Sequence, residues 1–268
     1  MADTDTKPAE ILYEVADHVA TVTLNAPERM NTISGPMLDE LCEALLKADA
    51  DKDVRCVILT GAGRAFCAGL NLESATKGEG IGSGAVASAT LDLRNTPPTV
   101  LFNMDTPTIC AINGGAAGYG MDTALGCDIR IMSDKAKMAA AFTKRGILPE
   151  SGGTWFLPRM LGWEKACELI FTGRTLSAED CLAERLCAKV VRHDTLMDEA
   201  RAMAREIASN APLAVQASKR LMRMGLSEPF TEHVHHVFLQ LLPLLKTEDA
   251  REGMMAFLEK RPAAFRGQ

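Results

Sequence analysis

The sequence predicts an α/β fold that ends in a helical region. Apolar runs of strand length alternate with stretches of helical spacing as far as Val191. Two of the apolar runs, Val54–Thr60 and Pro107–Asn113, end in glycine-rich turns. From His193 to Leu258 the spacing is almost entirely helical. Strand–helix alternation followed by helices implies an α/β core with a helical C-terminal region.

The first half of the chain alternates regularly between the two kinds of spacing. We expect strands at Ile11–Val15 and Val19–Leu24, a helix at Pro36–Ala50, a strand at Val54–Thr60, a helix around Thr90–Met104 and a strand at Pro107–Asn113. Asp17 and His18 form the expected hairpin turn between the first two strands. The strand Val54–Thr60 is apolar throughout, which is typical of a strand covered by helices on both faces.

One segment of the first half has a different composition. Ser74–Ser88 is rich in glycine and poor in large apolar residues, so we expect it to be mobile. Two interpretations stay open: a loop that closes over a ligand, or a plain insertion.

The second half begins with short elements and ends in helices. We expect a helix at Met121–Cys127, a strand at Asp128–Ser133, helices at Trp163–Thr172 and Ser177–Glu184, and a strand at Lys189–Val191. Ser177 is the expected N-cap of its helix, with Asp180 three residues further on. The C-terminal helices break at Asn210–Pro212 and at Glu228–Pro229. His236–Leu245 is too apolar to face water all round, so it packs on its own core or belongs to a subunit interface.

Composition and charge narrow the possible functions and locations. The net charge of −6 argues against a nucleic-acid-binding surface. The eight cysteines lie mostly in apolar runs without a CxxC pair, which favours free thiols in a reducing compartment. The N-terminus lacks the apolar segment of a signal peptide, and no 18-residue apolar run exists, so we expect a cytoplasmic protein without a membrane span. The histidines near residue 235 lack further ligands at metal-binding spacing, and we expect no metal site.

The first glycine-rich turn does not fit two common enzyme classes. In the stretch Gly61–Gly69, Phe66 stands where a dinucleotide-binding G-x-G-x-x-G motif requires its third glycine, so a nicotinamide oxidoreductase is weakly supported. The chain also lacks a G-x-S-x-G elbow, which leaves a serine hydrolase of the α/β type unsupported.

The second glycine-rich turn points to a different chemistry. Gly114, Gly115, Gly118 and Gly120 precede a helix directly. Close packing of a helix on a strand is one explanation, but four glycines open more space than such packing needs. Free N–H groups at a helix N-terminus, together with the helix dipole, can stabilise an oxygen that becomes negative. The two turns therefore predict an oxyanion hole for a thioester.

Taken together, these segments resemble the crotonase superfamily of enoyl-CoA hydratases and isomerases. The stretches GRAFCAGLNL and AINGGAAGYGMDTALGCDIR resemble its two oxyanion-hole segments, and FTKRGILPESGGTWFLPRMLG resembles its catalytic loop and helix. TGRTLSAEDCLAERLCAKVV and EGMMAFLEKRPAAFRG resemble later units, so the likeness runs from about Glu10 to Gly267. It implies a ClpP/crotonase-like spiral of ββα units, with residues 1–205 as the core that carries the site. Residues 206–268 would be a helical region for oligomerisation and active-site cover.

The resemblance also implies which residues would bind an acyl-CoA substrate. The two oxyanion donors would be the N–H groups of Ala68 and Tyr119. Coenzyme A enters as part of the substrate, and no separate cofactor is implied. The residues that would contact the substrate are Arg29, Cys67, Gly69, Leu70, Gly118, Gly120, Phe257 and Lys260. The last two match positions that reach the coenzyme A of a neighbouring subunit in a homotrimer or a dimer of trimers, although Lys260 also fits an ordinary surface lysine.

The carboxylates depart from the usual hydratase pattern of two glutamates. Asp122 occupies the first glutamate position, and Phe142 replaces the second. Glu150 instead matches the working carboxylate of a branch that includes enoyl-CoA isomerases. Its apolar neighbours Leu148 and Trp155 would favour proton exchange near neutral pH.

The sequence therefore favours an enoyl-CoA hydratase in which Glu150 moves the proton and Asp122 assists, because the two carboxylates still form a pair. Two alternatives remain: a Δ3-Δ2-enoyl-CoA isomerase that uses Glu150, and a crotonase-fold protein that binds acyl-CoA without turnover.

Overall fold

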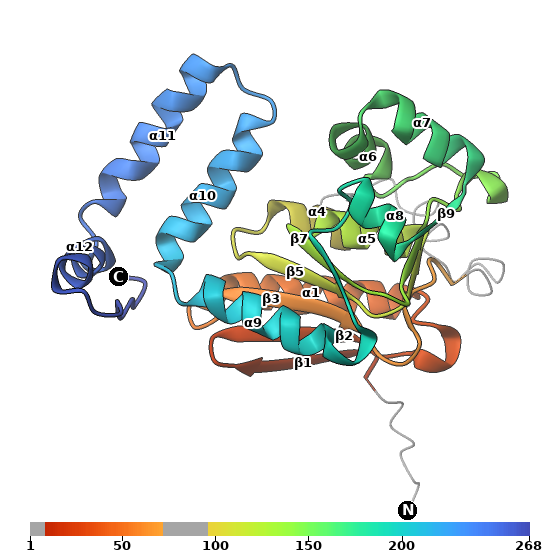
Figure 1. Ribbon diagram of the computed structural model, residues 1–268, viewed down its shortest axis with the longest axis horizontal. Coiled ribbons are helices and arrows are strands. Elements are labelled where there is room, and N and C mark those ends of the chain that lie inside the picture. The colour runs from red at the N-terminus through yellow and green to blue at the C-terminus, as the bar shows by residue number, and fades with distance from the viewer. Residues whose placement is uncertain (1–8, 72–95) are drawn as a thin grey trace, which may run out of the picture.

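The computed structural model describes residues 9–71 and 96–268, and a six-stranded sheet lies at its centre (Figure 1). The strands follow the order β1 (Ile11–Ala16), β2 (Val19–Leu24), β3 (Cys56–Gly61), β5 (Thr108–Ile112), β7 (Ile129–Ser133) and β10 (Lys189–Val191). Strands β1 and β2 are antiparallel, and every other neighbouring pair is parallel. Asp17 and His18 have φ values of 51° and 62°, as a two-residue hairpin turn requires, so the predicted hairpin is confirmed.

A second, smaller sheet was not predicted from the sequence. Its strands are β4 (Ala65–Cys67), β6 (Gly115–Ala117), β8 (Lys137–Ala139) and β9 (Thr175–Ser177), in that order. Each has three residues, which is too short for an alternating pattern to be recognised. The chain passes from a strand of the large sheet to a strand of the small sheet and then to a helix. This repetition is the expected spiral of ββα units.

Helices cover both faces of the large sheet. The helices of the core are α1 (Gly35–Ala50), α4 (Pro97–Asn103), α5 (Tyr119–Gly126), α6 (Gly153–Leu161), α7 (Trp163–Thr172), α8 (Ala178–Ala183) and α9 (Leu196–Ala208), with single turns η1 (Pro27–Arg29), η3 (Thr143–Arg145) and η4 (His193–Thr195). Helix α9 packs against Ile58 and Ile109 on one face, while α1, α4 and α5 pack on the other. All six residues of β3 are buried for this reason. Ser177 and Asp180 form the predicted cap of α8 as a reciprocal capping box.

The C-terminal helices project away from this core (Figure 1). They are α10 (Pro212–Gly225), α11 (Phe230–Leu244) and α12 (Glu248–Glu259), and we call them the C-terminal arm. The two predicted breaks are confirmed, but a third break before Glu248 was missed; there the Thr247 side chain caps α12. The ammonium of Lys219 on α10 joins the arm to the core, 2.8 Å from Asp128 and 2.9 Å from the carbonyl of Thr106.

Several other expectations can be compared with the structure. All eight cysteines are free and seven of them are buried, as predicted. Among the described residues, no helix is both long and apolar enough to cross a membrane. The glycine-rich segment Ser74–Ser88 and the first residues of the expected helix Thr90–Met104 lie outside the described residues.

Candidate active site

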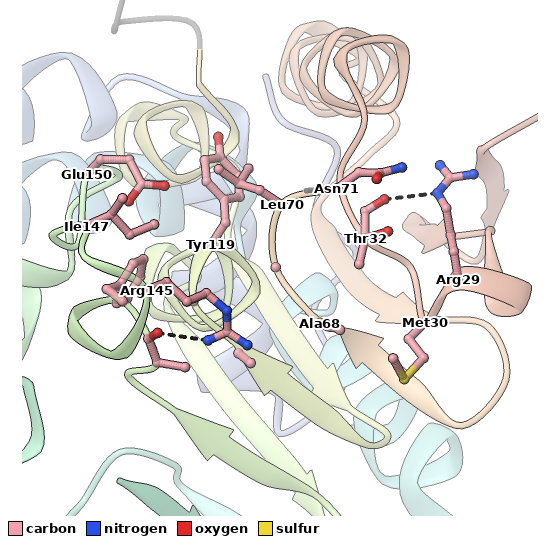
Figure 2. A pocket seen from close by; sticks show the side chains of 15 residues that line it. Arg29, Met30, Thr32, Ala68, Leu70, Asn71, Tyr119, Arg145, Ile147 and Glu150 are labelled. Atoms are coloured by element: carbon pink, nitrogen blue, oxygen red, sulfur yellow. Dashed lines mark hydrogen bonds between the residues drawn. The ribbon is translucent and has the colours of Figure 1, made fainter. Parts of the chain in front are cut away.

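A cavity of about 480 Å³ opens where the two glycine-rich turns meet the loop after β8 (Figure 2). We call it the amide cavity. Four stretches of chain line it: Arg29–Thr32, Ala68–Asn71, Ala117–Tyr119 and Ala141–Glu150. The fold therefore brings both predicted oxyanion segments and the predicted catalytic loop to one place.

Tyr119 presents its main-chain N–H at the N-terminus of α5. It is the first residue of the helix, with Gly118 as N-cap, so the helix itself supplies no acceptor for this N–H. Within the described chain no other acceptor pairs with it. The positive end of the helix dipole adds to the field at this point. The amide of Tyr119 is therefore suited to bind an oxygen that gains negative charge, while its ring is buried in the core.

The first predicted donor, Ala68, needs a correction. Its N–H donates to the carbonyl of Met30 at 3.0 Å and is therefore occupied. Leu70 instead forms a parallel bridge with Ile33, in which Ile33 donates to the carbonyl of Gly69 and Asn71 donates to the carbonyl of Ile33. Because neighbouring residues of an extended chain point their amides to opposite sides, the N–H of Leu70 faces away from Ile33. It has no acceptor among the described residues.

Gly69 explains why the N–H groups of Ala68 and Leu70 point in different directions. Its φ of 106° is unfavourable for other residues, and it rotates the chain between the amides of Ala68 and Leu70. A Cβ on Gly69 would lie 3.0 Å from the carbonyl oxygen of Ala117 and 3.9 Å from the nitrogen of Tyr119. The turn is thus pressed against the start of α5. Among the described residues, the amides of Leu70 and Tyr119 both lie at this contact, and neither has an acceptor.

Glu150 lines the amide cavity, as predicted for the proton-transferring group. It lies in a turn three residues before α6 begins at Gly153, not at the start of the helix itself. Figure 2 shows its carboxylate directed toward the side of the cavity where Tyr119 and Leu70 lie. Its side chain reaches solvent, yet partial burial raises the pKa of its carboxyl above the ordinary value of 4.5. Ile147 and Phe142 supply apolar wall nearby, whereas the expected neighbour Leu148 is 63% exposed.

Asp122 does not reach this cavity, which corrects its predicted catalytic role. It is fully buried on α5, and its Oδ2 accepts hydrogen bonds from the Ser151 hydroxyl at 2.9 Å and from the Gly153 N–H at 3.1 Å. Burial raises the pKa of the carboxyl to about 7, and the nearby Glu150 carboxylate contributes to the same shift. Asp122 therefore anchors the segment that follows Glu150. It helps to fix the turn that carries Glu150 and does not line the amide cavity.

Two more predicted contact residues belong to the core. The thiol of Cys67 is fully buried, and burial raises its pKa to about 12. Gly120 allows close packing, because a Cβ there would lie 2.2 Å from the carbonyl oxygen of Cys67. By contrast, Gly69, Leu70 and Gly118 line the cavity as expected. In the second turn, Gly120 therefore allows close packing and Gly118 lines the cavity.

Two arginines lie on the cavity wall. The guanidinium of Arg29, a predicted coenzyme A contact, donates to Glu10 at 2.6 Å and to the carbonyl of Thr32 at 3.2 Å. Arg145, which the sequence reasoning missed, donates to the carbonyl of Ala141 at 2.8 Å (Figure 2). Arg145 is exposed and pairs with no carboxylate among the described residues, so its charge is available to an anionic ligand. In the sequence, only its position in the K-R-G turn of the predicted catalytic loop could have indicated a role for Arg145.

Phe257 and Lys260 are not near the amide cavity of their own chain. They lie at the end of α12, on the side of the molecule opposite α6 and α7 (Figure 1). Phe257 is 83% exposed, and Lys260 is exposed as well. Their predicted contact with coenzyme A therefore requires a neighbouring chain.

Comparison with known proteins finds similarity to one family over almost the whole chain. Residues 14–268 match the family model described as Enoyl-CoA hydratase/isomerase. The (E)-benzylidenesuccinyl-CoA hydratase of Thauera aromatica is 38% identical over 259 residues, which cover 96% of this chain and 99% of that protein. The 1,2-epoxyphenylacetyl-CoA isomerase of Escherichia coli K12 is 35% identical over 260 residues, with 96% and 98% covered. The crystal structure of an enoyl-CoA hydratase from Bacillus anthracis superimposes with a TM-score of 0.90 at 34% identity, covering 97% of this chain and 100% of that one.

Proposed function

This chain belongs to the enoyl-CoA hydratase/isomerase family, and from that premise we propose that it forms the enolate of an acyl-CoA thioester and moves a proton with Glu150. The observation that carries the proposal is the position of one carboxylate beside two unpaired amides. Leu70 and Tyr119 supply the amides, and Glu150 lines the same cavity. The family fits acyl-CoA processing; the particular reaction is our inference.

The two amides stabilise the charge that develops on the thioester oxygen. When a proton leaves carbon 2, the C–H electron pair forms a C1=C2 double bond and the carbonyl electrons move onto oxygen. N–H groups held in place before the reaction stabilise this charge without reorganisation, which in other enzymes amounts to about 3–4 kcal/mol per donor. We place Leu70, not Ala68, opposite Tyr119, because the amide of Ala68 is bonded to Met30.

Isomerisation is the reaction that the site supports best. Glu150 as carboxylate takes the proton from carbon 2 of a 3-enoyl-CoA and becomes a carboxylic acid. It then gives that proton to carbon 4, while the enolate electrons return through carbon 3 to leave a 2-enoyl-CoA. One carboxylate is sufficient for both steps. Phe142 occupies the usual place of the second glutamate, and Asp122 is buried outside the amide cavity.

Hydration is the second candidate, favoured by the name of the Thauera aromatica relative. Glu150 would remove a proton from water as the oxygen attacks carbon 3, and would return it to carbon 2. The sequence favours hydration only if Asp122 and Glu150 act together on the substrate. In the described structure, Asp122 instead binds Ser151 and Gly153 and does not line the amide cavity.

A substrate panel separates these reactions. Purified protein is incubated with 3-hexenoyl-CoA and 2-hexenoyl-CoA, and the products are identified by mass spectrometry. Isomerisation leaves the mass unchanged and creates the absorbance of a conjugated enoyl thioester, whereas hydration adds the mass of water and removes that absorbance. Conversion of neither compound, with both still bound, would support an acyl-CoA-binding protein without turnover.

We further propose that the C-terminal arm packs against other copies of this chain in a homotrimer or a dimer of trimers. No residue of α11 is buried, although the helix carries large apolar side chains. Phe230 is 81% exposed and Phe238 57% exposed, an arrangement that favours burial in an interface. Assembly would also give Phe257 and Lys260 a neighbouring cavity to reach.

A further inference from the structure

A second cavity, of about 240 Å³, lies on the other side of Glu150. It is formed between α4 and the start of α6, and we call it the aromatic cavity. Among the described residues, Glu150 alone lines both cavities. A thioester whose oxygen sits on Leu70 and Tyr119 places its reacting carbons near Glu150. The remainder of the acyl group can then continue into the aromatic cavity.

Three aromatic rings make up the wall of this cavity. Phe102 comes from α4, and Trp155 and Phe156 come from the first turn of α6. Phe102 and Trp155 meet edge to face at 5.1 Å between ring centroids, and Trp155 meets Phe156 at 5.2 Å with an interplanar angle of 90°. Pro98 adds a further apolar surface. Such a wall binds flat apolar groups by stacking or by edge contacts.

The position of Trp155 is held from several sides. The guanidinium of Arg159 lies 4.0 Å from the centre of the indole ring, and it donates to the carbonyl of Trp155 at 3.1 Å. Phe156 is 7% exposed and packs against the backbone of Gly152. Asp122 fixes the same turn through Gly153. The rings therefore form a preformed surface, which lowers the entropy lost when a ligand binds.

The charge and size of the cavity limit what can occupy it. Apart from Glu150, no described side chain that lines it carries a charge; Thr96, Thr99 and Ser151 are its polar members. An anionic acyl end would therefore find no cationic partner among the described lining residues. An apolar cavity of about 150 Å³ is enough for benzene in a protein core. The aromatic cavity has room for one ring with a short linker.

We propose that the aromatic cavity binds the end of the acyl group and selects thioesters that end in an aromatic ring, with Trp155 as the residue that determines this specificity. The proposal rests on the proposed function, because it places the thioester oxygen at Leu70 and Tyr119. It extends that function by naming an aryl-substituted acyl-CoA as the substrate class.

Binding of unreactive thioesters tests the proposal without requiring turnover. The dissociation constants of 4-phenylbutanoyl-CoA and butanoyl-CoA are measured by titration calorimetry. The phenyl compound should bind at least about tenfold more tightly, since aromatic contacts and apolar burial both favour it. Trp155→Ala should remove most of this difference and leave the affinity for butanoyl-CoA within about twofold.

Two further variants complete the experiment. Thr99→Phe fills the cavity from α4 and should weaken binding of the phenyl compound alone, even if Trp155→Ala folds poorly. Thr154→Ala is the matched control, because Thr154 is an exposed neighbour on α6 that does not line the cavity.

The results also separate this proposal from the proposed function. If both thioesters bind with equal affinity, or if Trp155→Ala weakens both equally, the aromatic specificity is wrong and the acyl-CoA function stands. If neither compound binds, both proposals fail.

Discussion

The core and the C-terminal arm of this protein differ in how far their apolar residues are buried. In the core, strands β3 and β5 are completely buried between helices on both faces. In the arm, α11 buries none of its residues, and Phe238, Leu239 and Leu242 are each more than half exposed. Both segments are strongly apolar in sequence. The difference lies in what covers them.

The same difference separates the residues of the proposed active site from those of the proposed subunit interface. Leu70, Tyr119 and Glu150 lie in the core and line one cavity within a single chain. Phe257 and Lys260 lie at the end of the arm, and neither lines the amide cavity of its own chain. Changes in the core, and where α10 joins it, should therefore affect turnover or folding, and changes in α11 and α12 should affect assembly.

The largest effect is expected at Glu150. Glu150→Gln keeps the shape but cannot accept a proton, so turnover of the preferred enoyl-CoA should fall by about 10²–10⁴. Steady-state kinetics measure the loss, and size-exclusion chromatography should show unchanged assembly. If Asp122→Asn reduces turnover more than Glu150→Gln does, our assignment of the two carboxylates is reversed.

The next effect concerns Asp122 and the pH dependence of folding. In the folded protein its carboxyl holds a proton up to a pKa of about 7, whereas an unfolded chain releases it near 3.8. The folded state binds more protons in this interval, so this group lowers the free energy of unfolding as pH rises from about 4 to 7. Asn at this position does not titrate. Relative to wild type, Asp122→Asn should therefore gain stability across that interval, by up to about 4 kcal/mol.

Urea denaturation of both proteins at a series of pH values measures this gain. Taking the difference between them cancels the titration of all other groups. A difference that stays constant between pH 4 and 8 would show that Asp122 is not held in a raised-pKa environment.

A smaller effect is expected where the arm joins the core. Lys219→Met leaves the carbonyl of Thr106 without its donor and removes the charge beside Asp128. The Thr108 N–H and hydroxyl still bind Asp128, so the free energy of unfolding should fall by only about 2 kcal/mol. Lys246→Met on the exposed surface is the matched control and should change it by less than about 0.5 kcal/mol. Equal effects of the two substitutions would contradict this role of Lys219.

The smallest effect is expected for a single apolar residue of the arm. Phe238→Ser should weaken subunit association by about 1 kcal/mol, because it removes one apolar side chain from the proposed interface. Sedimentation velocity over a range of concentrations should show dissociation at higher concentration than in wild type. A wild-type protein that is monomeric throughout would end the interface proposal.

The fold could largely be predicted because its signals are local. The apolar run that became β3 and the polar hairpin turn at Asp17 and His18 each depend on neighbouring residues only. The same holds for the cap formed by Ser177 and Asp180. The three-residue strands of the small sheet could not be predicted, since their hydrogen bonds join segments distant in sequence. The residues of the aromatic cavity likewise could not be predicted to form one site, because α4 and α6 meet only in the folded chain.

By itself, the sequence determined the order of the elements, the two glycine-rich turns and the presence of Glu150 in the loop between them and α6. Only the tertiary structure decided which amide is free and which carboxylate reaches the cavity. Leu70 replaced Ala68 because the bridge to Ile33 and the turn at Gly69 set the direction of each N–H. Asp122 became an anchor because α6 packs over it and Ser151 and Gly153 bind its oxygen. The direction of a hydrogen bond depends on partners that one stretch of sequence does not contain.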